Sequence, residues 1–392
     1  MRHAISSLAA LLATLACEAH LDVLAARSGA TDGGGASQDS AGPPPGVVDV
    51  SAGFAETCAV IGSALACWGT LPDGHVSSVP ETIAGGGKGA WERISSGQRA
   101  HCGVELGGSL WCFGLDDQGQ LAQGDTTARA APAPVPLPGA ATRVRGHFAT
   151  FCAILQDGSA YCWGDNEEGQ LGQGDSYPGP DGLLPVRVGT TNDFIDADAG
   201  QGHACFVRGE GELYCTGRNT DGELGLGGGV EAQVRALTRV GDGTDWVSIA
   251  TGQGHTCGVR SSGELFCFGD GSAGQLGLGN RAPQPSPARV GTDSDWTAVD
   301  VDTFHSCGIR APGTLHCWGR NAEGQLGQGD ATDRDPTQVG AFTDWVQVAV
   351  GRFHTCARRA NGSLWCAGDN TDGRLGTGDF DRRSVMTEIR VR

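Results

Sequence analysis

Cysteine is the residue type whose number and spacing could do chemistry in this chain. Fifteen cysteines occur among 392 residues, and fourteen of them form seven close pairs with eight or nine residues between the partners. The pairs are Cys58 with Cys67, Cys102 with Cys112, Cys152 with Cys162, Cys205 with Cys215, Cys257 with Cys267, Cys307 with Cys317, and Cys356 with Cys366. Such pairs suit either disulfides or zinc, but paired zinc ligands usually have only about two to four residues between them. The spacing favours seven disulfides over zinc.

The residues midway between paired cysteines predict how each pair is positioned. Six pairs have a triplet there whose third residue is glycine, as in Ser261-Ser-Gly263, and a three-residue hairpin loop places its last residue in the left-handed region that glycine adopts easily. The first pair leaves the two-residue loop Gly62-Ser63, which suits a type II′ turn. Opposite residues of such a hairpin lie about 4.5 Å apart at Cα, which suits a disulfide. Each pair is therefore predicted to lie across a β-hairpin.

The cysteine pairs recur with a regular period. First cysteines are separated by 44, 50, 53, 52, 50 and 49 residues, and a fixed period of this size indicates a solenoid, propeller or array. Each copy reads as short strands with no helix, and seven copies over residues 47–392 leave enough chain for four strands each. We therefore expect an all-β protein, a seven-bladed β-propeller over 47–392 with one intra-hairpin disulfide in each blade.

Other residues that invite a chemical interpretation are explained by the repeat. One position is occupied in copies four to seven by His203, His255, His305 and His354. Glu56, Ala100 and Thr150 hold it in copies one to three, and equivalent positions in different blades are too far apart to share one ion, so we expect structural histidines. Acidic turns such as 165–169 and 369–373 lack the spacing of a calcium loop. We expect no metal, no cofactor and no catalytic residues, and therefore no enzyme.

Two acid and base pairs precede the last strand of their copies. Asp330 with Arg334, and Asp379 with Arg382, are predicted to form local ion pairs of small energetic worth.

The amino-terminal segment has the pattern of an export signal. A charged start, Met1-Arg-His3, precedes an apolar run from Ala4 to Ala16 that is too short to span a bilayer, which predicts a signal peptide over residues 1–16. Cys17, the fifteenth cysteine, follows a sequence that resembles a lipobox, although Thr14 departs from that pattern. We expect lipidation of Cys17, the alternative being ordinary cleavage near Ala16, Ala19 or Ala26. Residues 17–46 have the composition of a flexible Gly/Ser/Pro spacer.

The repeat resembles that of the regulator of chromosome condensation family. Cys162-Trp-Gly164 followed by Gly169-Gln-Leu-Gly-Gln-Gly174, and Cys317-Trp-Gly319 followed by Gly324-Gln-Leu-Gly-Gln-Gly329, match best, while the first copy lacks the Gln-Leu-Gly loop. The resemblance implies a seven-bladed β-propeller whose loop face grips other proteins, as in a secreted bacterial inhibitor of β-lactamase. It also implies the family's best-known activities, which are nucleotide exchange on a nuclear GTPase and chromatin binding.

Charge and compartment argue against those two activities. Forty-five acidic against 27 basic residues give a net charge of −18, which opposes nucleic acid and anionic membrane surfaces. Disulfides at this density imply an oxidising compartment. We therefore expect an exported, non-enzymatic module that lies at the outer envelope or cell surface, or is secreted. We expect it to be a monomer that binds an unidentified protein partner. Its only contact with the membrane is expected to be a lipid on Cys17.

The stretches that interrupt the repeat are where we expect the partner to bind. They are 71–76 in the first copy and 176–182 in the third, and the candidate binding residues are His75, Tyr177 and Asp181. Alternatives are an exchange factor as in eukaryotic members, a carbohydrate-binding propeller and a passive surface protein. The carbohydrate alternative needs carboxylates gathered on one face, and its candidates are Asp116, Asp165, Asp270 and Asp369.

Overall fold

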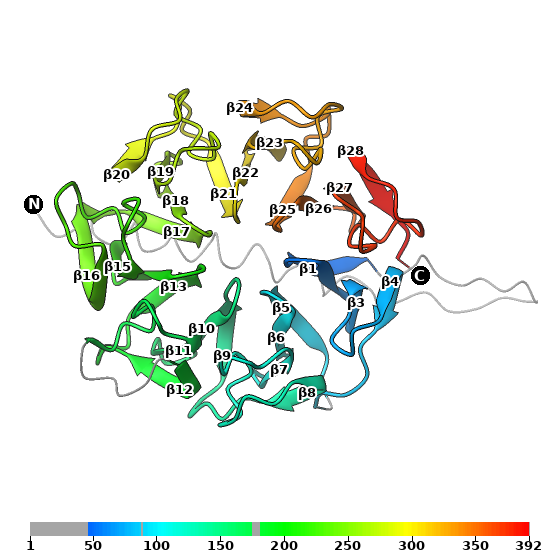
Figure 1. Cartoon of the computed structure of the whole chain (residues 1–392), viewed down its shortest axis with the longest axis horizontal. Helices are drawn as coiled ribbons and strands as arrows, with labels where there is room; N and C mark the ends of the chain where they lie inside the picture. The colour runs from blue at the N-terminus through cyan, green and yellow to red at the C-terminus, as the bar shows by residue number, and fades with distance from the viewer. Residues whose placement is uncertain (1–45, 88, 175–180, 392) are drawn as a thin grey trace, which may run out of the picture. The chain divides into compact units, whose positions relative to one another are not determined.

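The computed structural model describes residues 46–87, 89–174 and 181–391, which fold as seven four-stranded antiparallel sheets. The predicted signal peptide, Cys17, the spacer up to residue 45 and Tyr177 lie outside these residues. The sheets form the blades of a ring around a central channel (Figure 1). No α-helix occurs in the described ranges. The predicted seven-bladed β-propeller is confirmed.

Each blade is a single consecutive stretch of chain, and its strands follow one another from the channel outward. In that order the strands are, for blade 1, β1 (Val47–Ala52), β2 (Glu56–Ile61), β3 (Ala64–Thr70) and β4 (Val76–Thr82); for blade 2, β5 (Trp91–Ser96), β6 (Ala100–Glu105), β7 (Leu110–Gly114) and β8 (Arg129–Pro134); for blade 3, β9 (Ala141–Arg145), β10 (Thr150–Leu155), β11 (Ala160–Asp165) and β12 (Asp181–Val188); for blade 4, β13 (Phe194–Ala199), β14 (His203–Arg208), β15 (Glu212–Arg218) and β16 (Gln233–Thr244); for blade 5, β17 (Trp246–Thr251), β18 (His255–Arg260), β19 (Leu265–Gly269) and β20 (Gln284–Arg289); for blade 6, β21 (Trp296–Val301), β22 (His305–Arg310), β23 (Thr314–Gly319) and β24 (Arg334–Gln338); for blade 7, β25 (Trp345–Val350), β26 (His354–Arg359), β27 (Leu364–Gly368) and β28 (Arg383–Ile389).

The second and third strands of each blade form the predicted hairpin. In blade 5, for example, Cys257 lies directly opposite Cys267, and every cysteine pair has the same register and a Cα separation of 4.1 Å. Gly263 ends its three-residue loop with φ of 77°, and Gly62 begins the two-residue loop of blade 1 with φ of 63°. The predicted turns are therefore present.

All seven predicted disulfides are present, one in each blade. From blade 1 to blade 7 they join Cys58 to Cys67, Cys102 to Cys112, Cys152 to Cys162, Cys205 to Cys215, Cys257 to Cys267, Cys307 to Cys317, and Cys356 to Cys366. Each bond connects the second strand of its blade to the third. The prediction of one intra-hairpin disulfide per blade is confirmed.

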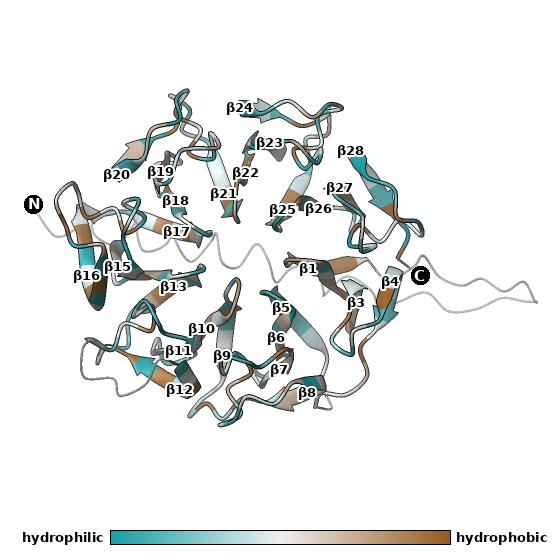
Figure 2. Cartoon of the chain, viewed as in Figure 1, coloured by the Kyte–Doolittle hydropathy of each residue, from teal (hydrophilic) through white to brown (hydrophobic). Residues whose placement is uncertain are grey.

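The core lies between neighbouring blades. One cluster, for example, packs Val60 and the buried Cys58–Cys67 disulfide of blade 1 against Trp91 and Phe113 of blade 2. Figure 2 shows hydrophobic brown segments on inner strands such as β1 and β17, and mainly hydrophilic colours on outer strands such as β20 and β28. Each sheet is thus covered on both faces by its neighbours, while its outer strand faces solvent.

The ring closes without exchanging a strand between its first and last blades. Blade 1 is built from β1 to β4 and blade 7 from β25 to β28, and β1 packs against β25 and β26. One backbone hydrogen bond recurs at all seven junctions: the first residue of an inner strand donates its N–H to the hairpin turn of the preceding blade, as Trp296 does to Gly263 O at 3.0 Å and Val47 does to Gly362 O at 3.0 Å. The junction between blades 7 and 1 is therefore built like the others.

Each blade presents two kinds of connection at the same end. Since its strands alternate in direction, the turn after the first strand and the loop after the third strand both lie at that end. We call the corresponding side of the ring the loop face. The opposite side carries the cysteine hairpins and the connections between blades.

Candidate functional site in the central channel

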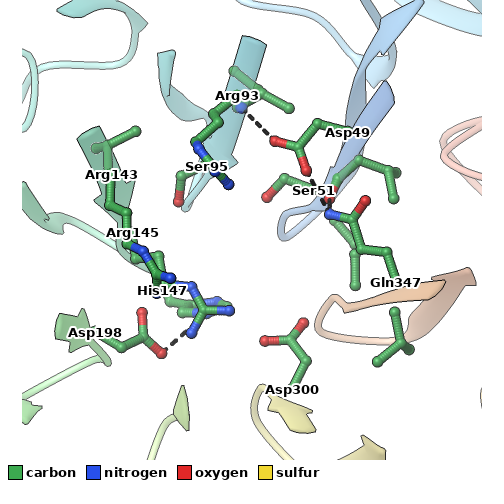
Figure 3. Close-up of a pocket in the computed structure, with 16 residues that line it drawn as sticks. Asp49, Ser51, Arg93, Ser95, Arg143, Arg145, His147, Asp198, Asp300 and Gln347 are labelled. Carbon is green, nitrogen blue, oxygen red and sulfur yellow. Dashed lines mark hydrogen bonds and ion pairs between the residues drawn. The ribbon is translucent and has the colours of Figure 1, made fainter. Parts of the chain in front are cut away.

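A cavity of about 260 Å³ lies at the centre of the ring, lined by inner strands of six blades (Figure 3). Each inner strand is an edge strand, so its outward backbone N–H groups find no partner within their own sheet. Alternate residues of these strands point into the channel, and many are charged, including Asp49, Arg143, Arg145 and Asp198. The channel is therefore a polar space in which edge backbone groups and charged side chains meet.

The channel carboxylates bond to the backbone of the next blade. Asp196 accepts a hydrogen bond from Ile249 N at 3.0 Å, and Asp198 accepts one from Thr251 N at 2.8 Å. Three more donor and acceptor pairs repeat this pattern, namely Ile94 N to Asp49 at 2.8 Å, Val350 N to Asp300 at 2.6 Å and Ser96 N to Ser51 Oγ at 2.9 Å. These side chains complete the edge strands and join neighbouring blades.

Arginine and histidine side chains from β9 and the turn after it balance the carboxylates. Arg143 donates to Asp196 at 2.7 Å, and Arg145 donates to Ile249 O at 2.8 Å. Burial lowers the pKa of His147, but the carboxylates of Asp198, Asp300 and Asp302 outweigh it, so its pKa is raised. Burial raises the pKa of Asp300 to about 6. Figure 3 shows His147 and Arg145 close to Asp198. The basic side chains and the carboxylates of the channel therefore offset one another's charge.

The recurring histidines hold blades together. Their Nε2 atoms lie 2.8 to 2.9 Å from a Thr or Ser hydroxyl of the next blade, in the pairs His203–Thr256, His255–Ser306, His305–Thr355 and His354–Thr57. Since Ser306 Oγ donates to Gln275 O, it accepts from a neutral His255 that is protonated on Nε2. Burial lowers the pKa of His255 to about 3. In blade 1 the equivalent Glu56 instead accepts the N–H of Arg99 at 2.8 Å.

The structure places His75 and Asp181 on the loop face, but in different blades. Exposed His75 lies 2.6 Å from Asp73 and 3.0 Å from Glu81, hydrogen bonds that raise its pKa. Asp181 opens β12 opposite Asp165. Burial raises the pKa of Asp181, as do nearby carboxylates. The structure therefore does not bring the two candidates together.

Most other acidic residues highlighted by the sequence brace their own loops. Asp270 accepts hydrogen bonds from Ser272 N and Gln275 Nε2, each at 2.8 Å, and the four carbohydrate-site candidates lie in four different blades. Asp330 pairs with Arg334 as predicted. The predicted pair of Asp379 with Arg382 is wrong, because Asp379 pairs with Arg383 at 2.5 Å.

Arg382 lies instead 3.2 Å from Glu323 of blade 6. Within the described ranges, no cluster of three or more His, Cys, Asp or Glu side chains could hold a metal ion. None of the same residues forms a helix long and apolar enough to cross a membrane.

The sequence did not lead us to predict the charged residues of the channel. Aligning the inner strands of the copies would have shown charged residues recurring at two alternate positions.

Family comparison agrees with this architecture. Residues 157–207, 210–259, 262–309 and 312–358 match the regulator of chromosome condensation (RCC1) repeat, and a second model of the same repeat matches 194–223, 246–275 and 345–374. The chain belongs to the RCC1 repeat family. Blades 1 and 2, which lie outside the matched segments, have the same four strands and the same disulfide in the structure.

Individual relatives share only part of the chain. Protein RCC2 of Homo sapiens is 36% identical over 107 residues, 27% of this chain and 20% of that protein. Protein RCC2 homolog of Xenopus laevis is 38% identical over 87 residues, 22% of this chain and 17% of that protein. The chain thus spans about a fifth of the length of the curated relatives it matches.

Solved structures resemble most of the ring. Human WBSCR16 has a TM-score of 0.72 at 18% identity, covering 81% of this chain and 85% of that one. Yeast RCC1 (Prp20) bound to Kap60 has a TM-score of 0.70 at 19% identity, covering 84% of each. These similarities show the shared propeller fold.

Proposed function

We propose that this protein is an exported, envelope-tethered module that binds another protein through the loop face of its propeller. The observation that carries the proposal is the buried disulfide in every blade. Such a framework forms in an oxidising compartment and holds the loop face in one conformation before a partner arrives, which lowers the entropic cost of binding.

The distribution of irregular sequence supports the loop face as the binding surface. His75 lies in the connection between β3 and β4, and Asp181 is the first residue of β12, at the loop-face end of that strand. The channel charges are largely bonded to one another and to backbone groups, so they form a frame for that face. The net charge of −18 favours protein partners over nucleic acid.

Affinity capture tests the binding function. The oxidised protein is immobilised beside a control protein of equal charge and exposed to envelope and extracellular fractions, and any enriched protein is purified and titrated calorimetrically. One partner with saturable binding, lost when the disulfides are reduced and alkylated, is the expected result. No partner beyond the control would contradict the proposal and favour a passive role or glycan binding. Faster nucleotide release from a GTPase would instead favour the exchange-factor alternative.

Export and tethering need their own test. Mass spectrometry of the mature protein is expected to find residue 17 at the amino terminus with a lipid on Cys17, and Cys17→Ser is expected to move the protein from the membrane fraction to the soluble one. An amino terminus at residue 1 with reduced cysteines would contradict export. Tyr177→Ala is expected to weaken binding to the captured partner, and unchanged affinity would remove Tyr177 from the binding surface.

A further inference from the structure

Arginine and phenylalanine side chains from three consecutive blades meet on the loop face. Phe304, Phe353 and Phe54 lie in the turns after the inner strands of blades 6, 7 and 1, Arg352 lies beside Phe353, and Arg320 directly follows β23. We call these five residues the Arg–Phe cluster. Phe54 also lines a small pocket together with His147 and Asp302, which places the cluster at the mouth of the channel.

The arginines and phenylalanines of this cluster alternate in space. The guanidinium carbon of Arg352 lies 3.9 Å from the ring centre of Phe54 and 5.0 Å from that of Phe353. Arg320 lies 5.3 Å from Phe304 and 6.0 Å from Phe353. Stacking on aromatic faces holds a guanidinium group in place while leaving its N–H edges available to an acceptor.

Arg352 differs from the other stacked arginines of this protein. Arg208, Arg260, Arg310 and Arg359 also stack on aromatic rings, and each lies within 3.5 Å of an aspartate that begins or precedes an inner strand. The Arg352 side chain forms no hydrogen bond or ion pair with any residue that the structure describes, and its Nε atom is buried without a partner. The carboxylate that completes those four stacked sites is thus missing at Arg352.

The charges around Arg352 compensate it only in part. Burial lowers the pKa of Arg352 and outweighs the opposing effect of Asp302, and the neighbouring Arg374 and Arg320 lower that pKa further. Arg374 pairs with Asp369 at 3.2 Å and also with Asp372, whereas Arg320 has one ionic contact among the described residues, with Glu323 at 4.0 Å. In a chain of net charge −18, this cluster is a local positive site.

The cluster is built on a rigid part of the ring. Arg352 N donates to Gly53 O at 3.3 Å, and Arg374 Nη1 donates to Phe54 O at 2.9 Å. His354 and Thr57 link the same two blades immediately beneath. The turns that present Arg352 and Phe54 are therefore fixed relative to each other before any ligand binds.

We propose that the Arg–Phe cluster binds a carboxylate side chain from an acidic segment of a partner protein, with the phenylalanine rings packing against an apolar residue beside it. This inference rests on the proposed protein-binding function and gives the chemistry of the partner. A single carboxylate fits one guanidinium group that has no ion pair among the described residues, while the acidic surroundings repel densely charged polyanions such as nucleic acid.

Fluorescence anisotropy with a synthetic probe tests the inference. The oxidised full chain is titrated with the fluorescein-labelled peptide Gly-Glu-Phe-Glu-Phe-Gly, and separately with the same peptide carrying glutamine in place of both glutamates. The acidic peptide is expected to bind at least tenfold more tightly. Arg352→Gln is expected to remove that preference, Arg320→Gln to reduce it, and Arg239→Gln to preserve it, because Arg239 lies in β16 and pairs with Glu212.

Equal binding of the two peptides, or an unchanged preference in both Arg352→Gln and Arg320→Gln, would overturn the inference. So would an oligonucleotide that binds in an Arg352-dependent way and displaces the peptide. Circular dichroism and a count of free thiols establish that each variant is folded. If affinity capture yields a partner whose binding ignores Arg352, the inference fails while the proposed function stands; if capture yields none, the proposed function fails even where the peptide binds.

Discussion

At the scale of single residues, the histidines show how one polar side chain can serve a buried junction. His255 is buried between blades 5 and 6, and its Nε2 atom lies 2.9 Å from Ser306 Oγ. The hydroxyl donates its own hydrogen bond to Gln275 O, so Nε2 carries the imidazole hydrogen, and burial keeps the ring neutral by lowering its pKa. A buried imidazole that keeps this tautomer links two blades without the desolvation penalty of a charge.

Replacing this histidine is expected to destabilise the protein markedly. His255→Ala removes a buried side chain and leaves the Ser306 hydroxyl without its hydrogen-bond donor. We therefore expect a loss of about 2 to 4 kcal/mol in the free energy of unfolding. Urea denaturation of the oxidised protein at pH 7.5 measures it. His75→Ala is the matched control, because His75 is exposed and should change stability by less than about 0.5 kcal/mol. Equal effects of the two variants would contradict the structural role.

The same variant is expected to respond to pH. Folded His255 stays neutral down to a pKa of about 3, whereas the unfolded chain binds the proton near pH 6.5. The stability that His255 contributes is therefore complete above pH 6.5 and is lost progressively as the pH falls toward 3. The destabilisation caused by His255→Ala should be smaller at pH 5 than at pH 7.5, and a loss independent of pH would show that His255 titrates normally in the folded protein.

At the scale of elements, the hairpin glycines have two reasons to be glycine. Gly263 has a positive φ of 77°, as the turn type requires. A Cβ atom there would also lie 2.3 Å from Ser294 O, since the turn abuts the start of the next blade. The sequence predicts the first reason, because turn geometry depends on neighbouring residues. It cannot predict the second, which depends on how blades pack.

Two glycine substitutions separate these effects. Gly279→Ala meets a positive φ of 71° but open space, so it should cost about 1 to 2 kcal/mol. Gly263→Ala meets the same strain and a backbone oxygen as well, so it should cost at least about 2 kcal/mol more. Thermal and urea unfolding of both variants measure the difference. Similar losses would mean that the blade junction adjusts without cost.

Each disulfide is expected to stabilise its own hairpin independently of the other six. Each closes a short loop with a sequence separation of 9 or 10 residues, so replacing Cys257 and Cys267 together with alanine should cost about 2 to 3 kcal/mol on the chain-entropy model. A thiol titration should still find the six other disulfides closed. If the double variant lost all of its disulfides, oxidation would have to be cooperative around the ring.

At the scale of the whole molecule, the sequence predicted the features that recur within each blade. It did not predict the contacts that form only when the blades assemble into a ring. The cysteine and glycine spacing defined blades and hairpins because both are local. The Asp379 pairing was wrong by one residue, since Arg383, at the start of β28, faces that carboxylate. Phe54 and Arg352 are separated by almost 300 residues and meet only where the ring closes, so neither residue alone indicates the Arg–Phe cluster.

Because blades 7 and 1 exchange no strand, the ring should still form when the chain begins at a different blade. Val47 and Val391 belong to one hydrophobic cluster, so the two ends of the ring lie close together. A circular permutant that joins residue 391 to residue 46 by a short Gly/Ser linker and opens the exposed connection at 291–294 should fold, with seven disulfides and an unchanged circular dichroism spectrum. Failure to fold under oxidising conditions would show that the original junction is special.

The placement of the disulfides also sets how the ring would respond to mechanical load. All seven that the structure describes lie inside a blade, so noncovalent contacts among the described residues would carry tension applied across the junction of blades 7 and 1. Blades would then detach in succession. Each would release a repeat of about 50 residues, less the ten or so bridged by its disulfide, an extension of about 140 Å that would lengthen under reducing conditions.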